Sequence, residues 1–136
     1  MKFREFSNLG WRVSEIGLGC WAIGADWGDV SIDDAREVLK TSLDKGVNFY
    51  DTADVYGDGR SEQLVSELIK STSERLYVVT KAGRRLNPHT AEGYNLVNIE
   101  SFVDRSLKNL NVECIDLLQL HCPPTETYSK KETYEM

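Results

Sequence analysis

The fold is decided by one stretch of the sequence, Val47-Asn48-Phe49-Tyr50-Asp51-Thr52-Ala53-Asp54-Val55-Tyr56-Gly57. Its apolar opening predicts a buried β-strand, and Asp51 is the ionisable residue that directly follows that strand. Two later strands are predicted to end in the same way, one before Lys81 and one before His121. Parallel α/β proteins bind ligands at the carboxyl ends of their strands, so these three side chains and nearby Tyr56 predict one shared site. Three such residues in register favour that site over the alternative, in which each side chain only begins a solvated loop.

Outward from this stretch, the sequence alternates between strand and helix patterns. Short apolar runs predict four strands, at residues 16–19, 47–50, 76–79 and 115–120. Between them lie three amphipathic stretches with helical spacing, the first capped by Ser31 and the third expected to be capped by Asn98. Strands joined in this way by helices predict a parallel sheet with right-handed crossovers.

The two ends of the chain carry different patterns. Residues 2–6 and 12–16 flank the turn-forming segment Ser7-Asn8-Leu9-Gly10, which predicts an N-terminal β-hairpin. The polar residues 125–136 follow Pro123-Pro124 and are interpreted as the beginning of a further helix. No linker or low-complexity segment divides the chain, so we expect one structural unit.

The composition excludes several classes of protein. The 136 residues suffice for one domain, and 40% apolar with 28% charged residues argue against a disordered or collagen-like chain. The 16 basic and 22 acidic side chains give a net charge of −6, which disfavours a nucleic-acid partner. An odd number of cysteines, three, and a charged N-terminus predict a cytoplasmic protein without a disulfide framework. The apolar-rich residues 16–25 are too short to span a membrane.

The four residues of the predicted site suit proton transfer to a carbonyl oxygen. A free phenol has a pKa of about 10, and a nearby ammonium such as that of Lys81 favours the phenolate. Asp51 would hold that ammonium charged and oriented, and His121 would donate a hydrogen bond to the substrate oxygen. Protonation of the oxygen would accompany hydride transfer to the carbon, and the hydride requires a cofactor because no side chain supplies one.

Weaker motifs receive simpler interpretations. The segment Gly17-Leu18-Gly19 lacks a third glycine, so a Rossmann dinucleotide site is not predicted. Cys122 is expected to be passive, and the spacing of the cysteines and His121 does not fit a metal site. Arg84-Arg85 is interpreted as a solvated loop, with contact to an anionic substrate as the alternative.

Together, these features resemble the N-terminal half of an aldo-keto reductase over essentially the whole chain. The resemblance rests on the hairpin that leads into residues 13–19, on residues 48–57, on Val79-Thr80-Lys81 and on residues 115–121. It implies a (β/α)8 TIM-type barrel, of which this chain holds the first four strands and three helices after the hairpin. The implied activity is reduction of an aldehyde or ketone, a small carbonyl substrate, by NADPH.

The same resemblance assigns roles to individual residues. It implies that Tyr56 is the general acid, that Lys81 and Asp51 tune it and that His121 orients the carbonyl. The implied cofactor contacts are Gly19, Cys20, Trp21 and Asp51, with cysteine at a position where the family often has threonine. Trp21, Tyr56 and His121 are the implied substrate contacts.

The length of the chain qualifies these expectations. A barrel of this type needs about 250 residues, so we expect residues 1–136 to be an N-terminal half, truncated near the start of the fourth helix. Most of the NADPH site would then lie in the second half, and the isolated chain is expected to be inactive. Exposed half-barrel edges would allow a homodimer. The alternative is a non-catalytic binding, regulatory or self-associating module, because some members of the family serve as channel accessory subunits.

Overall fold

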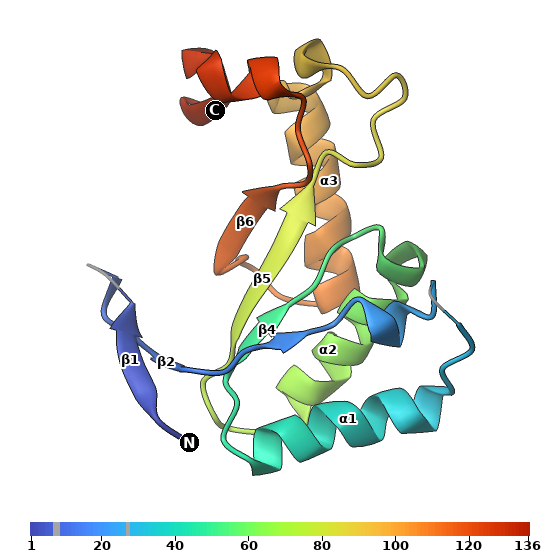
Figure 1. The fold of residues 1–136 in the computed structure, drawn as a ribbon, viewed down its shortest axis with the longest axis vertical. Coiled ribbons are helices and arrows are strands. Elements are labelled where there is room, and N and C mark those ends of the chain that lie inside the picture. Colours follow the sequence, from blue (N-terminus) through green and yellow to red (C-terminus); the bar gives the residue numbers. More distant parts are fainter. Residues whose placement is uncertain (7–8, 27) are drawn as a thin grey trace.

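A computed structural model describes residues 1–6, 9–26 and 28–136. Strands β1 (Phe3–Phe6) and β2 (Trp11–Ser14) pair in antiparallel fashion, which confirms the predicted hairpin (Figure 1). Ser7 and Asn8, two residues of the turn predicted between these strands, lie outside the described residues.

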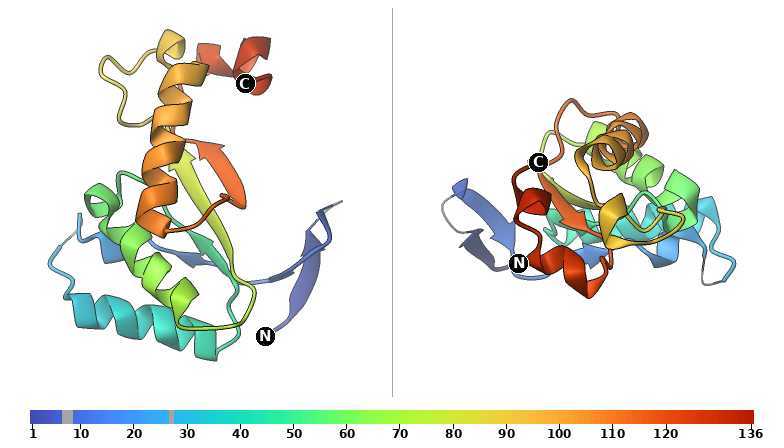
Figure 2. Two further views of the ribbon diagram at one scale, coloured as in Figure 1. Left: turned by 180° about the vertical axis from the view of Figure 1, so that it is seen from behind. Right: turned by 90° about the horizontal axis from the view of Figure 1, so that it is seen from above.

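A four-stranded parallel sheet follows the hairpin, as the strand–helix alternation predicts. Its strands stand in sequence order, and they are β3 (Leu18–Gly19), β4 (Phe49–Asp51), β5 (Tyr77–Ala82) and β6 (Leu117–Leu120). The connecting helices are α1 (Ile32–Asp44), α2 (Arg60–Lys70) and α3 (Leu96–Leu110). All three cover one face of the sheet, and the hairpin lies on the other side (Figures 1 and 2).

The strand period of two divides the sheet residues between these faces. Tyr50 and Val78 point toward the helices and lie in the main apolar core. Residues of the opposite parity point away from the helices, and there Tyr77 stacks on Trp11 of the hairpin with ring centroids 4.9 Å apart. Asp51 and Lys81 share the parity of Tyr77's face, so the pleat places both ionisable side chains away from the helical layer.

The helix starts confirm one predicted cap and correct another. Ser31 caps α1, because its side-chain oxygen accepts the backbone N–H of Asp34 at 3.0 Å. The predicted cap of α3, Asn98, is wrong: Asn95 caps the helix by accepting the N–H of Asn98 at 3.1 Å. The first residues of α3 are exposed, so the apolar stripe of the helix begins only at Ile99. The sequence pattern therefore predicts a helix start that is later than the observed one.

The connections contain short 3₁₀ turns. These are η2 (Ala22–Gly24), η3 (Tyr56–Gly59), η4 (Ala91–Gly93), η5 (Thr125–Ser129) and η6 (Lys131–Tyr134). The last two occupy the segment that was expected to begin a further helix. Within the described residues, no helix is both long and apolar enough to cross a membrane.

Candidate active site

Lys81 and Asp51 form an ion pair across two neighbouring strands. The Lys81 ammonium donates to Asp51 Oδ1 at 2.5 Å and to the carbonyl oxygen of Thr52 at 2.8 Å. The Lys81 side chain is 13% exposed and that of Asp51 is 38% exposed. The carboxylate and the carbonyl therefore hold a nearly buried ammonium at the carboxyl end of the sheet.

Tyr56 reaches the same place from the loop after β4. Its ring centroid lies 4.9 Å from the Lys81 ammonium. The position depends on Gly57, whose φ is +59°, and on its close approach to Gly24. A Cβ on Gly57 would lie 2.1 Å from the Gly24 carbonyl oxygen, so only glycine allows η2 and η3 to dock in this way. The Gly57 N–H also donates to Asp26 Oδ2 at 2.7 Å.

His121 completes the predicted group at the end of β6. Its backbone N–H donates to Ala82 O at 2.7 Å, which extends the ladder between β5 and β6 by one residue. Its ring meets the Tyr56 ring nearly edge-on, with centroids 5.8 Å apart and an interplanar angle of 89°. The structure thus brings together Asp51, Tyr56, Lys81 and His121, as the sequence predicts.

The surroundings of His121 keep its ring neutral. The residue is 6% exposed, and burial lowers its pKa from 6.5 to about 4, with the positive charges of Lys81 and Arg84 acting in the same direction. Its Nδ1 is buried and has no hydrogen-bond partner among the described residues. A buried N–H without an acceptor is costly, so the ring proton is better placed on Nε2, where it can be donated to a ligand.

Two residues that the sequence patterns do not predict as part of the site hold the backbone of His121 in place. The Tyr94 hydroxyl donates to the backbone carbonyl of His121 at 2.8 Å, and His89 Nε2 lies 2.9 Å from the hydroxyl oxygen. A carbonyl can only accept, so Tyr94 uses its proton there and His89 donates to Tyr94. The Tyr94 ring also packs against Gly83, where a Cβ would lie 2.3 Å from a ring carbon.

A buried polar network lies beneath the four residues. Glu62 of α2 is fully buried, and it accepts the Thr80 hydroxyl at 2.6 Å and the Asn109 amide at 2.8 Å. The Ser61 hydroxyl donates to the carbonyl oxygen of Cys20 at 2.8 Å. These bonds fasten the helices to the strand ends that carry the ionisable residues.

A cavity of about 380 Å³ opens in front of Tyr56 and His121. It is lined by Trp21, Asp26, Val55, Tyr56, Arg84 and His121. The Trp21 ring lies across Tyr56 with centroids 6.2 Å apart and an interplanar angle of 30°. All three predicted substrate contacts therefore line one cavity.

Some of the residues predicted to contact the cofactor lie outside this cavity. Gly19 and Asp51 line another hollow of about 380 Å³, on the hairpin side of the sheet. Cys20 is fully buried in the core, and its backbone N–H donates to Asp51 O at 2.8 Å. Burial raises the pKa of the Cys20 thiol to about 12. The polar groups of Cys20 are already partnered, so this geometry favours a positioning role for Cys20 over direct contact with a cofactor.

The two adjacent arginines after β5 behave differently from each other. Arg85 donates to Asp54 Oδ2 at 2.8 Å and to Asp58 Oδ1 at 2.5 Å, so its positive charge is paired with two carboxylates of the protein. Arg84 instead lines the cavity in front of Tyr56. The described residues contain no group of three or more His, Cys, Asp or Glu side chains placed to hold a metal ion.

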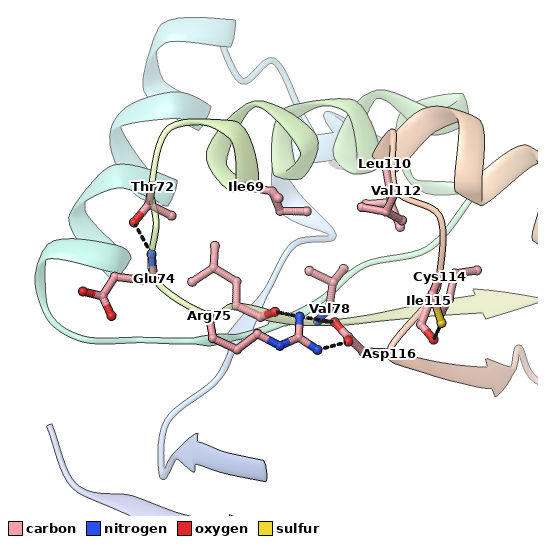
Figure 3. Close-up of a pocket in the computed structure, with 11 residues that line it drawn as sticks. Ile69, Thr72, Glu74, Arg75, Val78, Leu110, Val112, Cys114, Ile115 and Asp116 are labelled. Carbon is pink, nitrogen blue, oxygen red and sulfur yellow. Dashed lines mark hydrogen bonds and ion pairs between the residues drawn. The ribbon is translucent and has the colours of Figure 1, made fainter. Parts of the chain in front are cut away.

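A smaller hollow of about 190 Å³ lies at the opposite, amino-terminal end of the strands (Figure 3). Its central charged groups pair with each other, because Asp116 accepts from the Arg75 guanidinium and, at 2.9 Å, from the Val78 N–H. The ionisable residues at the carboxyl end of the sheet therefore mark the better candidate site.

Comparison with known proteins agrees on one family. Residues 15–136 match the sequence profile of the Aldo/keto reductase family. The aldo-keto reductase YhdN of Bacillus subtilis (strain 168) is 35% identical in an alignment 127 residues long, which covers 90% of this chain and 38% of that protein. A protein of Arabidopsis thaliana named as a probable voltage-gated potassium channel subunit beta is 28% identical over 130 residues, 93% of this chain and 39% of that protein.

Solved structures show the same likeness. The holo form of aldo-keto reductase AKR11C1 from Bacillus halodurans has a TM-score of 0.81 and 32% identity, over 99% of this chain and 44% of that one. An aldo/keto reductase from Klebsiella pneumoniae in complex with NADP and acetate has a TM-score of 0.73 and 25% identity, over 93% and 41% of the two chains. The predicted barrel class is confirmed, and the chain spans 38–44% of the length of these relatives.

Proposed function

Because this chain belongs to the aldo/keto reductase family, we propose that it carries the proton-donating residues of an NADPH-dependent reductase of aldehydes or ketones. The observation that carries the proposal is the convergence of an ion-paired lysine, a tyrosine and a neutral histidine at one cavity. The family relationship alone would support an oxidoreductase, and the geometry of these residues adds the division of roles.

Tyr56 is the proton donor in this proposal. The Lys81 ammonium lies close to its ring and stabilises the phenolate that remains after the proton has left. Asp51 orients the Lys81 ammonium through the 2.5 Å hydrogen bond. The fixed positions of the two groups reduce the reorganisation that proton transfer would otherwise require.

His121 orients the substrate oxygen. Its neutral ring donates from Nε2, and its burial keeps it neutral at physiological pH. A neutral donor polarises the carbonyl without delivering its own proton, so the acid role stays with Tyr56. Trp21 forms the apolar wall of the same cavity and would pack against a small carbonyl substrate.

The residues present fit a nicotinamide cofactor beside this group. NADPH, when bound, supplies the hydride that the carbonyl carbon accepts. Asp51 retains a partly exposed carboxylate next to Gly19, where a Cβ would meet nothing within 4 Å. This open backbone and carboxylate would hold the nicotinamide riboside. The NADP complex of the Klebsiella relative supports the choice of cofactor.

The proposal extends to architecture and location. We infer that residues 1–136 form the N-terminal half of a barrel whose second half provides most of the NADPH contacts, because the chain matches 44% of a barrel relative at a TM-score of 0.81. If no second half covers them, the edges of β3 and β6 are open to pairing, and a homodimer through these edges is the alternative that we propose. The three cysteines are free thiols, which supports a cytoplasmic location.

A non-catalytic module is the second candidate, and the channel-subunit relative favours it. A chimera separates the two candidates. Residues 1–136 replace the matching segment of the Bacillus subtilis relative, and NADPH oxidation is followed with a neutral aldehyde, butanal, and with an anionic one, 4-oxobutanoate. The reductase proposal predicts turnover that requires both NADPH and aldehyde. A folded chimera that binds NADPH without turnover would overturn it and favour the module.

A further inference from the structure

The Arg84 guanidinium lines the cavity and forms no ion pair with any residue that the structure describes. Among the described residues it makes one hydrogen bond, from Nη1 to the Cys122 sulfur at 3.6 Å. A thiol is a weak acceptor, so this contact leaves most of the donors of Arg84 unused. Arg85, its neighbour in the chain, is paired with two carboxylates.

Two other charged residues near the cavity, Lys81 and Asp26, have partners of different kinds. Lys81 is paired with Asp51. The acidic residue of the cavity wall, Asp26, accepts the Gly57 N–H and forms no ion pair with Arg84 within 4.0 Å in the part of the chain that the structure describes. Among residues 1–6, 9–26 and 28–136, Arg84 is therefore the cation that lines the cavity without an ion-pair partner. A guanidinium in this position matches the paired oxygens of a carboxylate or phosphate.

The backbone that carries Arg84 is held firmly. Gly83, which precedes it, has a φ of +114° and packs under the buried Tyr94 ring. Tyr94 in turn donates to the carbonyl of His121, so one tyrosine holds the backbone just before Arg84 and the backbone of His121. The positive charge of Arg84 contributes to the lowered pKa of His121, which places it within electrostatic reach of that ring. The backbone therefore places the exposed Arg84 side chain beside the cavity, and only that side chain has to be ordered when a ligand binds.

We propose that Arg84 is a specificity-determining residue that binds an anionic group, a carboxylate or a phosphate, of the carbonyl substrate. This inference rests on the proposed function, because it names the substrate class of the same cavity. The preferred substrates are then oxo-acids or phosphorylated aldehydes rather than neutral aldehydes.

Binding to the 136-residue chain tests the inference without requiring catalysis. The guanidinium NMR signals of the chain are followed while 4-oxobutanoate or its neutral methyl ester is added at constant ionic strength. The two compounds share the aldehyde and differ in charge. A third titration with inorganic phosphate distinguishes a phosphate site from a carboxylate site.

The inference predicts that the charged compound, or phosphate, shifts the Arg84 signal and binds about tenfold more tightly than the ester. Arg84→Gln should abolish that difference. Arg36→Gln changes the net charge equally, at a position on helix α1 that does not line the cavity, and should leave the difference intact. Three results would overturn the inference. The acid and the ester could bind equally while phosphate has no effect, or no probe could shift the Arg84 signal. The preference for the charged compound could also survive in Arg84→Gln.

The chimera separates this inference from the proposed function. If the chain shows the Arg84-dependent preference but the chimera reduces no carbonyl, the anion site stands and the reductase proposal fails. If the chimera reduces acid and ester with equal kcat/KM, and Arg84→Gln changes neither value, the reductase stands and the anion site fails.

Discussion

The pH dependence of folding provides a direct test of the environment of His121. In the folded chain the pKa of His121 is lowered from 6.5 to about 4, mainly by burial. Between these two values the unfolded chain binds the proton and the folded chain does not, so the free energy of unfolding rises with pH. The difference between the two pKa values corresponds to about 3 kcal/mol in the free energy of unfolding. This stability is fully present above pH 6.5 and is lost as the pH falls toward 4.

The assay compares the parent chain with His121→Gln. Glutamine keeps a side-chain donor and does not titrate, so subtracting its unfolding free energies removes the contributions of the carboxylates. Both chains are unfolded in urea at a series of pH values. The difference between their free energies of unfolding should change by about 3 kcal/mol between pH 6.5 and pH 4. A difference independent of pH, or an NMR titration of the His121 ring at its ordinary value, would refute the neutral-donor argument.

Three further substitutions test how the site is held in place. Gly57→Ala should lower the free energy of unfolding by at least about 2 kcal/mol in urea unfolding, because its Cβ would collide with the carbonyl of Gly24. Glu62→Ala should cost about 3 kcal/mol by the same measurement, since it leaves the buried Thr80 hydroxyl and the half-buried Asn109 amide without an acceptor. Tyr94→Phe should cost about 1 kcal/mol and change the backbone NMR signals around His121, because that carbonyl loses its donor. A loss within about 0.5 kcal/mol for any of the three would contradict the contact it removes.

The order of the elements and the meeting of the ionisable residues could be predicted because both depend on local patterns. Apolar runs define strands, and parallel strands bring their carboxyl ends to one edge, so Asp51, Lys81 and His121 had to lie together. Tyr56 could be included because it follows Asp51 closely in the loop.

The support of the site could not be predicted in the same way. The bond between Tyr94 and His121 joins residues 27 positions apart, and no local pattern encodes it. The burial of Cys20 depends on how α1 and α2 pack against β3, which periodicity alone does not describe. In the described part of the chain, Arg85 is paired and Arg84 is not, because only Arg85 reaches carboxylates that are distant in the sequence.

The most direct test of the central claim is the kcat of the NADPH-dependent chimera with Tyr56→Phe. If Tyr56 is the proton donor, kcat should fall by about 10²- to 10⁴-fold while NADPH affinity is unchanged. Tyr134→Phe removes an exposed hydroxyl away from the cavity and should leave kcat unaltered. A Tyr56→Phe chimera that retains the parent kcat would contradict the claim that this phenol supplies the proton.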